Sequence, residues 1–200
     1  MKFDPKIRHR ASTRLQGFDY TLAGAYFITL VTFQRELLFG DITDGQMKLN
    51  RRGEIVQEEW FRSAGIRKEI RLFFDEFVVM PNHIHGIVWI VDGNIVIDTN
   101  VGANEYPNRI VNTNAVVGAD GRPPLPMPSR KLRSLGSFVA GFKSSVTKRI
   151  RNKLNETGIW QRNYYDRIIR NEKELDNIRK YIETNPANWA KDEENISLRK

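Results

Sequence analysis

The stretch "VVMPNHIHGIVWIV", residues 78–91, is the most informative part of this 200-residue chain about its fold. Two apolar runs flank the pair Pro81-Asn82, and such a pair between apolar segments is typical of a tight turn. The stretch therefore predicts an antiparallel β-hairpin. Its second run carries two of the three histidines of the chain, His83 and His85. Because side chains alternate across a strand, both imidazoles should project from one face, about 7 Å apart.

Further β-structure is expected on both sides of this hairpin. Residues 25–33, "AYFITLVTF", are rich in aromatic and β-branched side chains and predict a buried strand. The segments "LLFG" and "MKLN" around two glycines predict a small hairpin. The first arm of the main hairpin is expected to include "RLFFDEFVVM", and "IWQRNYYDRII", residues 159–169, predicts the last strand.

Three helices are predicted from apolar residues that recur at helical spacing. The first covers roughly residues 53–68, and the second covers roughly residues 134–154 with a continuous apolar stripe. The third begins after Asn171, a good N-cap with Glu174 three residues on, and Pro186 should end it near residue 184 or 185. Apart from this last helix, the order of elements is βαββαβ, which predicts an α+β ferredoxin-like sandwich with an antiparallel sheet.

The length predicts one domain over residues 1–200. Residues 92 to about 130 are dominated by Asn, Gly, Val and Pro and predict a flexible insertion, because so long a structureless loop is uncommon inside a compact domain. A tolerated spacer is the simplest reading of this insertion, and contact with a substrate is the alternative.

Composition narrows the class of protein. The chain lacks cysteine, which excludes disulfides, thiolate metal sites and cysteine nucleophiles. No segment approaches the about 18 apolar residues that a membrane span requires, and the polar, basic N-terminal residues do not resemble a signal peptide, so we expect a cytoplasmic protein and no membrane partner. The net charge of +8 favours a polyanionic partner, nucleic acid before a membrane surface, over a merely basic exterior.

Basic side chains gather in two places. Five of them occupy the C-terminal half of the second predicted helix: Lys143, Lys148, Arg149, Arg151 and Lys153. Cations there complement the helix dipole, but this number exceeds what capping needs and suits contact with phosphates. Three more, Arg162, Arg167 and Arg170, alternate with Trp160, Tyr164 and Tyr165. Aromatic and basic side chains in such alternation suit single-stranded nucleic acid, while core packing is the alternative for each ring and the favoured one for Trp160.

The pair His83 and His85 can converge on one metal ion, since neutral imidazole is a common metal ligand; a half-exposed pair beside a turn is the alternative. The last predicted helix offers further candidates. Tyr181 and Asn185 are four residues apart and share one helical face, at the border where the helix meets the sheet. A tyrosine in that place is by itself more often a core-edge residue.

The segments "MPNHIHGIVWI", "SLGSFVAGFKSSVTKRI" and "WQRNYYDRIIRNEKELDNIRKYIETNPANW" together resemble the single-tyrosine HUH transposases. The resemblance is greatest to the REP-associated tyrosine transposases and extends from about residue 20 to residue 189, without the insertion. It implies that His83 and His85 form the strand motif of the metal site, that Asn185 completes the site, and that Tyr181 is the nucleophile. It also implies Mg²⁺ or Mn²⁺ as the metal, although imidazole ligands alone favour softer ions.

The activity implied by this resemblance is DNA transposition. Tyr181 would cleave single-stranded, hairpin or palindromic DNA through a 5′-phosphotyrosine, and the retained bond energy would allow strand joining without ATP. The alternatives are another HUH nickase (a replication initiator or relaxase), a catalytically silent nucleic-acid-binding module, or a metal-binding protein without a nucleic-acid partner. The sequence leaves monomer or dimer open.

Two features of the expected site stay open at this level. Asn185 precedes Pro186, which disfavours helical geometry in the preceding residue, and Glu183 or Asp166 would replace Asn185 if its amide pointed away. Tyr164 and Tyr165 are alternative nucleophiles, but neighbours on a strand face opposite ways, so at most one of them can reach the histidines.

Overall fold

The computed structural model describes residues 15, 17–91 and 134–195. The insertion predicted at 92 to about 130 lies outside these residues. Within them, the protein is an α+β structure built on an antiparallel sheet, as the sequence predicts. No helix in the described ranges is both long and apolar enough to cross a bilayer.

The main sheet has β1 (Gly24–Val31) and β6 (His83–Ile90) at its centre. On the outer side of β1 lies β7 (Tyr165–Ile169), and on the outer side of β6 lie two short strands, β4 (Ile70–Arg71) and β5 (Phe77–Val79). All of these pairs are antiparallel. The register between the central strands places Thr29 opposite His85 and Val31 opposite His83.

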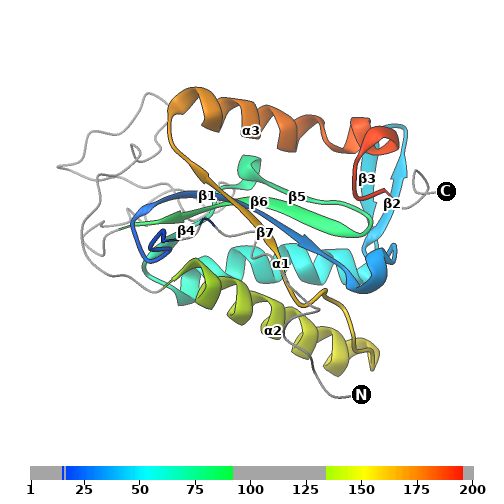
Figure 1. Cartoon of the computed structure of the whole chain (residues 1–200). Coiled ribbons are helices and arrows are strands. Elements are labelled where there is room, and N and C mark those ends of the chain that lie inside the picture. The colour runs from blue at the N-terminus through cyan, green and yellow to red at the C-terminus, as the bar shows by residue number, and fades with distance from the viewer. Residues whose placement is uncertain (1–14, 16, 92–133, 196–200) are drawn as a thin grey trace, which may run out of the picture.

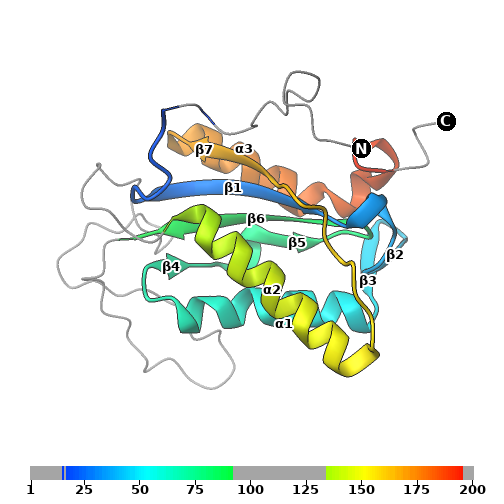
Figure 2. The same ribbon diagram turned by 60° about the horizontal axis from the view of Figure 1, so that its bottom comes forward.

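Helices cover both faces of this sheet. α1 (Arg51–Ile66) and α2 (Leu135–Leu154) lie along one face, and α3 (Glu172–Thr184) lies along the other (Figures 1 and 2). Two apolar cores result. The larger one fills the space between the sheet and α1 and α2, and the smaller one lies under the stripe Leu175, Ile178 and Ile182 of α3.

Alternation along β6 assigns its side chains to these two layers. Ile84, Val88 and Ile90 belong to the larger core, while Ile87 and Trp89 belong to the smaller one under α3. The histidines have the same parity as this second set, so they face α3. Gly86, between them and the rest of the strand, packs directly on Trp60: a Cβ at this position would lie 2.5 Å from a carbon of the indole ring.

Side-chain caps set where α1 and α3 begin. α1 begins two residues earlier than expected because the Asn50 side chain accepts hydrogen bonds from the amides of Arg52 and Gly53. The Asn171 side chain caps α3 by accepting from the Glu174 amide, as predicted. α3 ends at Thr184, and Pro186 then opens a short 3-10 helix, η3 (Pro186–Lys191).

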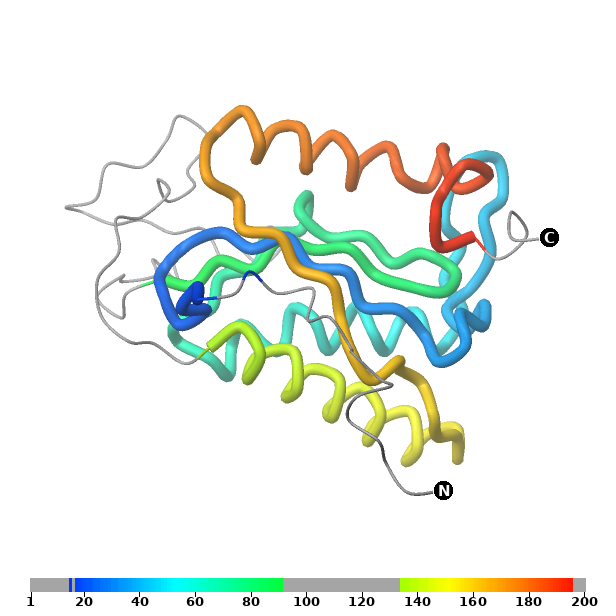
Figure 3. The backbone as a smooth tube through the Cα atoms, viewed as in Figure 1, coloured from blue at the N-terminus to red at the C-terminus, as the bar shows by residue number. Residues whose placement is uncertain are grey.

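The strands depart more from expectation. The predicted long arm "RLFFDEFVVM" is interrupted by a 3-10 turn, η2 (Phe74–Glu76), which separates β4 from β5. The last strand is also shorter than predicted, since only an isolated bridge to Thr32 involves Trp160. Here the carbonyls of Gln161 and Asn163 accept hydrogen bonds from the Lys143 ammonium. The short hairpin β2 (Gly40–Thr43) and β3 (Gln46–Leu49) exists as predicted, and it lies beside η3 (Figure 3).

Candidate metal and tyrosine site

The two histidine side chains of β6 converge below α3. The Nε2 atoms of His83 and His85 are 3.0 Å apart, much closer than the spacing of their backbones. Both side chains are buried, with 0% and 4% of their surfaces exposed. Burial lowers the pKa of His83 to about 3 and lowers that of His85 well below its usual value, so both rings are neutral at pH 7. Neutral imidazole is the form that binds metal ions.

The tautomer of His83 follows from its contact with Asn82. The Asn82 amide nitrogen donates to the carbonyls of Arg35 and Glu194, at 3.2 Å and 2.7 Å, which leaves its oxygen as an acceptor. That oxygen lies 2.9 Å from His83 Nδ1, so Nδ1 carries the proton and Nε2 has a free electron pair. A second partner that orients the imidazole in this way is typical of histidine metal ligands.

His85 is held by a hydroxyl from the neighbouring strand. Its Nδ1 lies 2.9 Å from the Thr29 hydroxyl oxygen, directly across the β1–β6 pair. Its Nε2 lies 3.2 Å from the hydroxyl oxygen of Tyr181 on α3. When His85 donates through Nδ1 to Thr29, both Nε2 atoms of the pair present electron pairs to the same small space.

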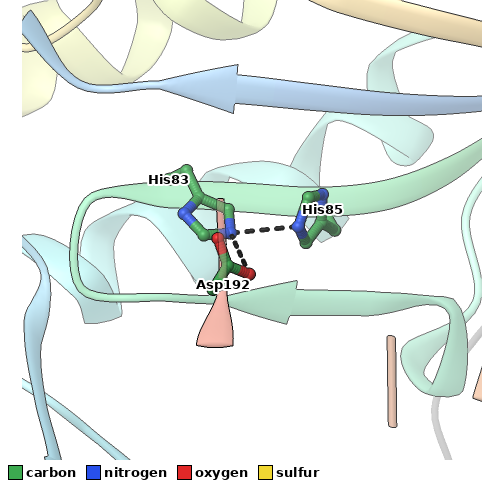
Figure 4. Close-up of side chains that lie close together, drawn as sticks. All are labelled: His83, His85 and Asp192. Atoms are coloured by element: carbon green, nitrogen blue, oxygen red, sulfur yellow. Dashed lines mark hydrogen bonds and ion pairs between the residues drawn. The ribbon is translucent and has the colours of Figure 1, made fainter. Parts of the chain in front are cut away.

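A carboxylate completes this group. Asp192, directly after η3, is buried, and one of its oxygens lies 3.9 Å from His83 Nε2 (Figure 4). The ligand atoms of His83, His85 and Asp192 all lie within 4.8 Å of one another. Asp192 was not predicted from the sequence, because it lies beyond Pro186, where no periodic pattern relates it to the histidines. The acidic run "DEE" at 192–194 is the one feature of the sequence that points to it.

The side chain of Asn185 also points into the site. Its amide nitrogen donates to an Asp192 oxygen at 2.9 Å, and its own oxygen is buried without a hydrogen-bond partner among the described residues. The expectation that Pro186 would push this residue out of helical geometry is wrong: Asn185 has φ −59° and ψ −43°. Pro186 stands at the first position of η3, where a proline causes no loss of a helical hydrogen bond.

Neither proposed replacement for Asn185 reaches the histidines. Glu183 is exposed on α3 and is not part of the metal-ligand group. Asp166 pairs in register with Ile28, whose side chain is in the larger core, so Asp166 faces α1 and α2 rather than α3. The acidic ligand therefore comes from the segment after η3.

This donor set suits a divalent cation. Two neutral imidazole nitrogens and one carboxylate oxygen converge in a buried place, and the neighbouring Asn185 side chain has an unpartnered amide oxygen. An amide oxygen buried without a partner costs free energy unless something polar satisfies it. The mixture of nitrogen and oxygen donors is compatible with Mn²⁺ and with other divalent ions.

Tyr181 lies at the edge of this group, with 44% of its surface exposed. Its ring contacts the rings of Phe27 and His85 edge-on. Burial of the hydroxyl, together with the negative charges of Asp192 and Glu193, raises the pKa of Tyr181 to about 12. Tyr181 borders a pocket of about 380 Å³, whose other lining residues are Phe27, Thr29, Arg35, His85, Tyr165, Asp192, Glu193 and Glu194.

The two alternative tyrosines lie on opposite sides of the edge strand. Tyr165 lines the pocket of Tyr181 and is exposed. Tyr164 is partly buried against the larger core. The expectation that at most one of them shares the site agrees with this placement, and Tyr181 is the tyrosine with a described contact to His85.

The basic residues singled out in the sequence fall into three groups. Lys143, Lys148, Arg151 and Arg162 line a second pocket, of about 540 Å³, between α2 and the segment before β7. Two arginines form ion pairs: Arg149 with Glu58 and Glu59 of α1, and Arg167 with Glu174. Lys153 and Arg170 are exposed. Trp160 also lines the second pocket and contacts the rings of Phe39 and Phe142.

Fold and site thus define an α+β protein with a buried two-histidine, one-carboxylate group beside a half-exposed tyrosine. The chain is 34% identical over 195 residues to an uncharacterized protein of Haemophilus influenzae, and the match covers 96% of each chain. This chain belongs to the same family as that protein. No model of a known protein family matches the chain. Among solved structures, a REP-associated tyrosine transposase bound to a REP hairpin is similar, with a TM-score of 0.48, 15% identity, and coverage of 88% of this chain and 74% of the other.

Proposed function

We propose that this protein is a single-tyrosine HUH transposase, which cleaves and rejoins single-stranded or hairpin DNA with the help of a divalent cation. The observation that carries the proposal is the 3.2 Å contact between the Tyr181 hydroxyl and Nε2 of His85, the nitrogen that also faces His83. A nucleophile beside a candidate metal ligand allows one bound cation to act on both the phenol and the phosphate. The proposal includes the specific fold of these transposases, a ferredoxin-like βαββαβ sandwich with an additional helix that carries the tyrosine.

In this mechanism the Tyr181 oxygen attacks the scissile phosphorus. A bond forms between that oxygen and phosphorus, and the bond from phosphorus to the 3′-oxygen of the preceding nucleotide breaks. The phenolic proton is lost to solvent and the 3′-oxygen takes up a proton, so the products are a 5′-phosphotyrosine and a 3′-hydroxyl. Attack by a 3′-hydroxyl on the phosphotyrosine reverses these steps and joins two strands.

The residues that would hold the cation are His83, His85, Asp192 and Asn185. A bound Mn²⁺ or Mg²⁺ would neutralise charge on the phosphate and favour the ionised form of a nearby phenol. Asp192 supports these hard ions, since a set of two imidazoles without a carboxylate favours softer metals. Asn82 and Thr29 hold the two rings so that the electron pairs of both Nε2 atoms remain available.

For the DNA backbone we propose the second pocket, because Lys143, Lys148, Arg151 and Arg162 line it together and no carboxylate is among its lining residues. Lys153 and Arg170 are further candidates for contact with DNA because both are exposed, whereas Arg167 contributes less free charge because Glu174 pairs with it. Arg149 contributes less free charge, since two glutamates of α1 already pair with it. The partner is DNA, the expected location is the bacterial cytoplasm at the nucleoid, and a monomer is the simpler assembly.

The deciding experiment is incubation with a hairpin-bearing single-stranded DNA, with Mn²⁺ or Mg²⁺ and in parallel with EDTA. We expect a protein–DNA adduct that survives denaturing electrophoresis, requires the cation and is absent in Tyr181→Phe. The matched control is Tyr165→Phe, in which the adduct should persist. Binding without an adduct under every metal condition would instead indicate a silent binding module, and an adduct that depends on Tyr165 would displace Tyr181 as the nucleophile.

A further inference from the structure

Arg35 occupies an unusual backbone conformation in η1 (Phe33–Arg35), the 3-10 turn that follows β1. It and the preceding residue, Gln34, have φ angles of +59° and +53°, so two consecutive residues other than glycine are left-handed. Such conformations cost free energy and persist where the surroundings impose them, which is frequent at functional sites. Here the Arg35 carbonyl is held by the buried amide of Asn82, the same side chain that orients His83.

This conformation directs the Arg35 side chain into the pocket of Tyr181. The guanidinium Nε donates to a Glu194 carboxylate oxygen at 2.6 Å, and Arg35 lines the pocket together with Tyr165 and Tyr181. Three carboxylates and one guanidinium line the pocket: Asp192, Glu193, Glu194 and Arg35. A phosphodiester that enters therefore meets more negative than positive charge from these side chains, and Arg35 is the cation among the described lining residues.

The ion pair between Arg35 and Glu194 orients the guanidinium in the pocket, and it is not needed to hold the C-terminal segment in place. Glu194 is also held through its own carbonyl, which accepts from Asn82 at 2.7 Å. The C-terminal segment thus keeps an attachment to the site that does not involve the guanidinium. A guanidinium has five N–H donors in a planar fork, so the hydrogen bond from Nε to Glu194 leaves other donors for a phosphate oxygen.

We propose that Arg35 is a catalytic residue, which binds a non-bridging oxygen of the scissile phosphate and stabilises the negative charge that develops there during the attack by Tyr181. The inference rests on the proposed function and adds a residue to it. Arg35 forms and breaks no covalent bond in this step and keeps its protons. A planar, permanently charged donor near the reacting phosphate is the means by which arginine accelerates phosphoryl transfer.

The test compares two versions of one DNA substrate, with a normal phosphodiester or an uncharged methylphosphonate at the cleavage point. On the phosphodiester, we expect Arg35→Ala to slow single-turnover adduct formation by about 100-fold or more. On the methylphosphonate, which has lost the charge that Arg35 would neutralise, the same variant should lose less than about 10-fold relative to wild type, since the stabilising contact has no charge to act on. Arg35→Gln, which keeps a donor for Glu194, should behave like Arg35→Ala and serves if the alanine variant unfolds.

The matched control is Arg52→Ala. Arg52 also pairs with a glutamate from a distant part of the chain, Glu156, but does not line the pocket, so its loss should leave both rates unchanged. Equal losses on the two substrates, or a wild-type rate in a folded Arg35 variant, would overturn the role of Arg35. If the wild-type protein forms no adduct that depends on Tyr181, the proposed function itself fails, which is a different result.

Discussion

The hydroxyl oxygen of Tyr181 lies 3.2 Å from His85 Nε2, although the two residues are 96 positions apart in the chain. The same nitrogen lies 3.0 Å from His83 Nε2. A cation bound between the imidazoles would therefore be a neighbour of the phenol oxygen. This contact joins the tyrosine and the candidate metal ligands into one site.

Metal binding should depend on Asp192 as strongly as on the histidines. In calorimetric titrations with Mn²⁺, His83→Ala and Asp192→Asn should each abolish measurable binding, because each removes a direct ligand. Asn185→Ala should weaken binding less, since an amide oxygen carries no net charge. Glu183→Gln, an exposed acid on the same helix, is the control and should bind as wild type does. Unchanged affinity in Asp192→Asn would remove the carboxylate from the site.

The ionisation of Tyr181 should respond to the cation. Without metal its pKa is about 12, because burial and the nearby carboxylates disfavour the phenolate. The phenolate fraction of the metal-free protein should rise about tenfold per pH unit below this pKa. Mn²⁺ should lower the pKa, which ultraviolet difference titration against Tyr181→Phe can measure. An unchanged pKa at saturating Mn²⁺ would contradict contact between the ion and the phenol.

The two buried histidines should make the metal-free protein sensitive to acid. In the unfolded chain they take up protons near pH 6.5, whereas in the folded protein the pKa of His83 is about 3 and that of His85 is also strongly lowered. The unfolded state therefore binds more protons below pH 6.5, and the free energy of unfolding should fall as the pH drops from 6.5 toward 3. The slope should reach about 1.4 kcal/mol per pH unit for each histidine.

Urea unfolding in EDTA at several pH values between 7.5 and 4.5 measures this slope. In His85→Gln one of the two groups is gone, so the slope in this range should be about half of that in the wild type. A free energy of unfolding that does not change with pH would mean that the imidazoles are not buried as neutral rings.

The tyrosine helix should depend on the buried carboxylate of Glu76. One of its oxygens accepts from the Trp89 indole at 2.6 Å, and the other accepts from Arg179 of α3 at 2.9 Å. Glu76→Ala removes the buried carboxylate partner of the Arg179 guanidinium, which keeps a longer contact of 3.4 Å with the exposed Asp176, and should cost about 3–5 kcal/mol in unfolding free energy. Glu54→Ala removes an exposed pair with Arg51 and, as a control, should cost less than about 1 kcal/mol. Similar losses in both variants would show that Glu76 does not fasten α3.

The close contact between β6 and α1 should make Gly86 intolerant of a side chain. A Cβ there would lie 2.5 Å from the Trp60 ring, so Gly86→Ala must displace the indole and should destabilise the protein by about 1–3 kcal/mol. Gly141→Ala, in α2 with nothing within 4 Å of the new Cβ, should be neutral or stabilise by up to about 1 kcal/mol. Thermal unfolding of the two variants compares them directly. If Gly86→Ala unfolds at the wild-type temperature, the larger core has room for the Trp60 indole to move.

Local patterns in the sequence were sufficient for much of the fold. The α+β class, the antiparallel sheet, the small hairpin and the cap at Asn171 follow from periodicity and from short-range hydrogen bonding. Strand ends were harder to predict. Trp160 and its neighbours have strand-like residues, yet a lysine from α2 takes two of the carbonyls that a strand would use.

For the site, sequence by itself determined that His83 and His85 share one face of a strand, because alternation is a property of the backbone. Helical periodicity likewise determined that Tyr181 and Asn185 share one face of α3. Only the tertiary structure decided that α3 covers the histidine face, that Asp192 returns to it after η3, and that Asn82 and Arg35 border it. These contacts join residues that are distant in the chain, and they depend on how separate elements pack, which no local pattern encodes.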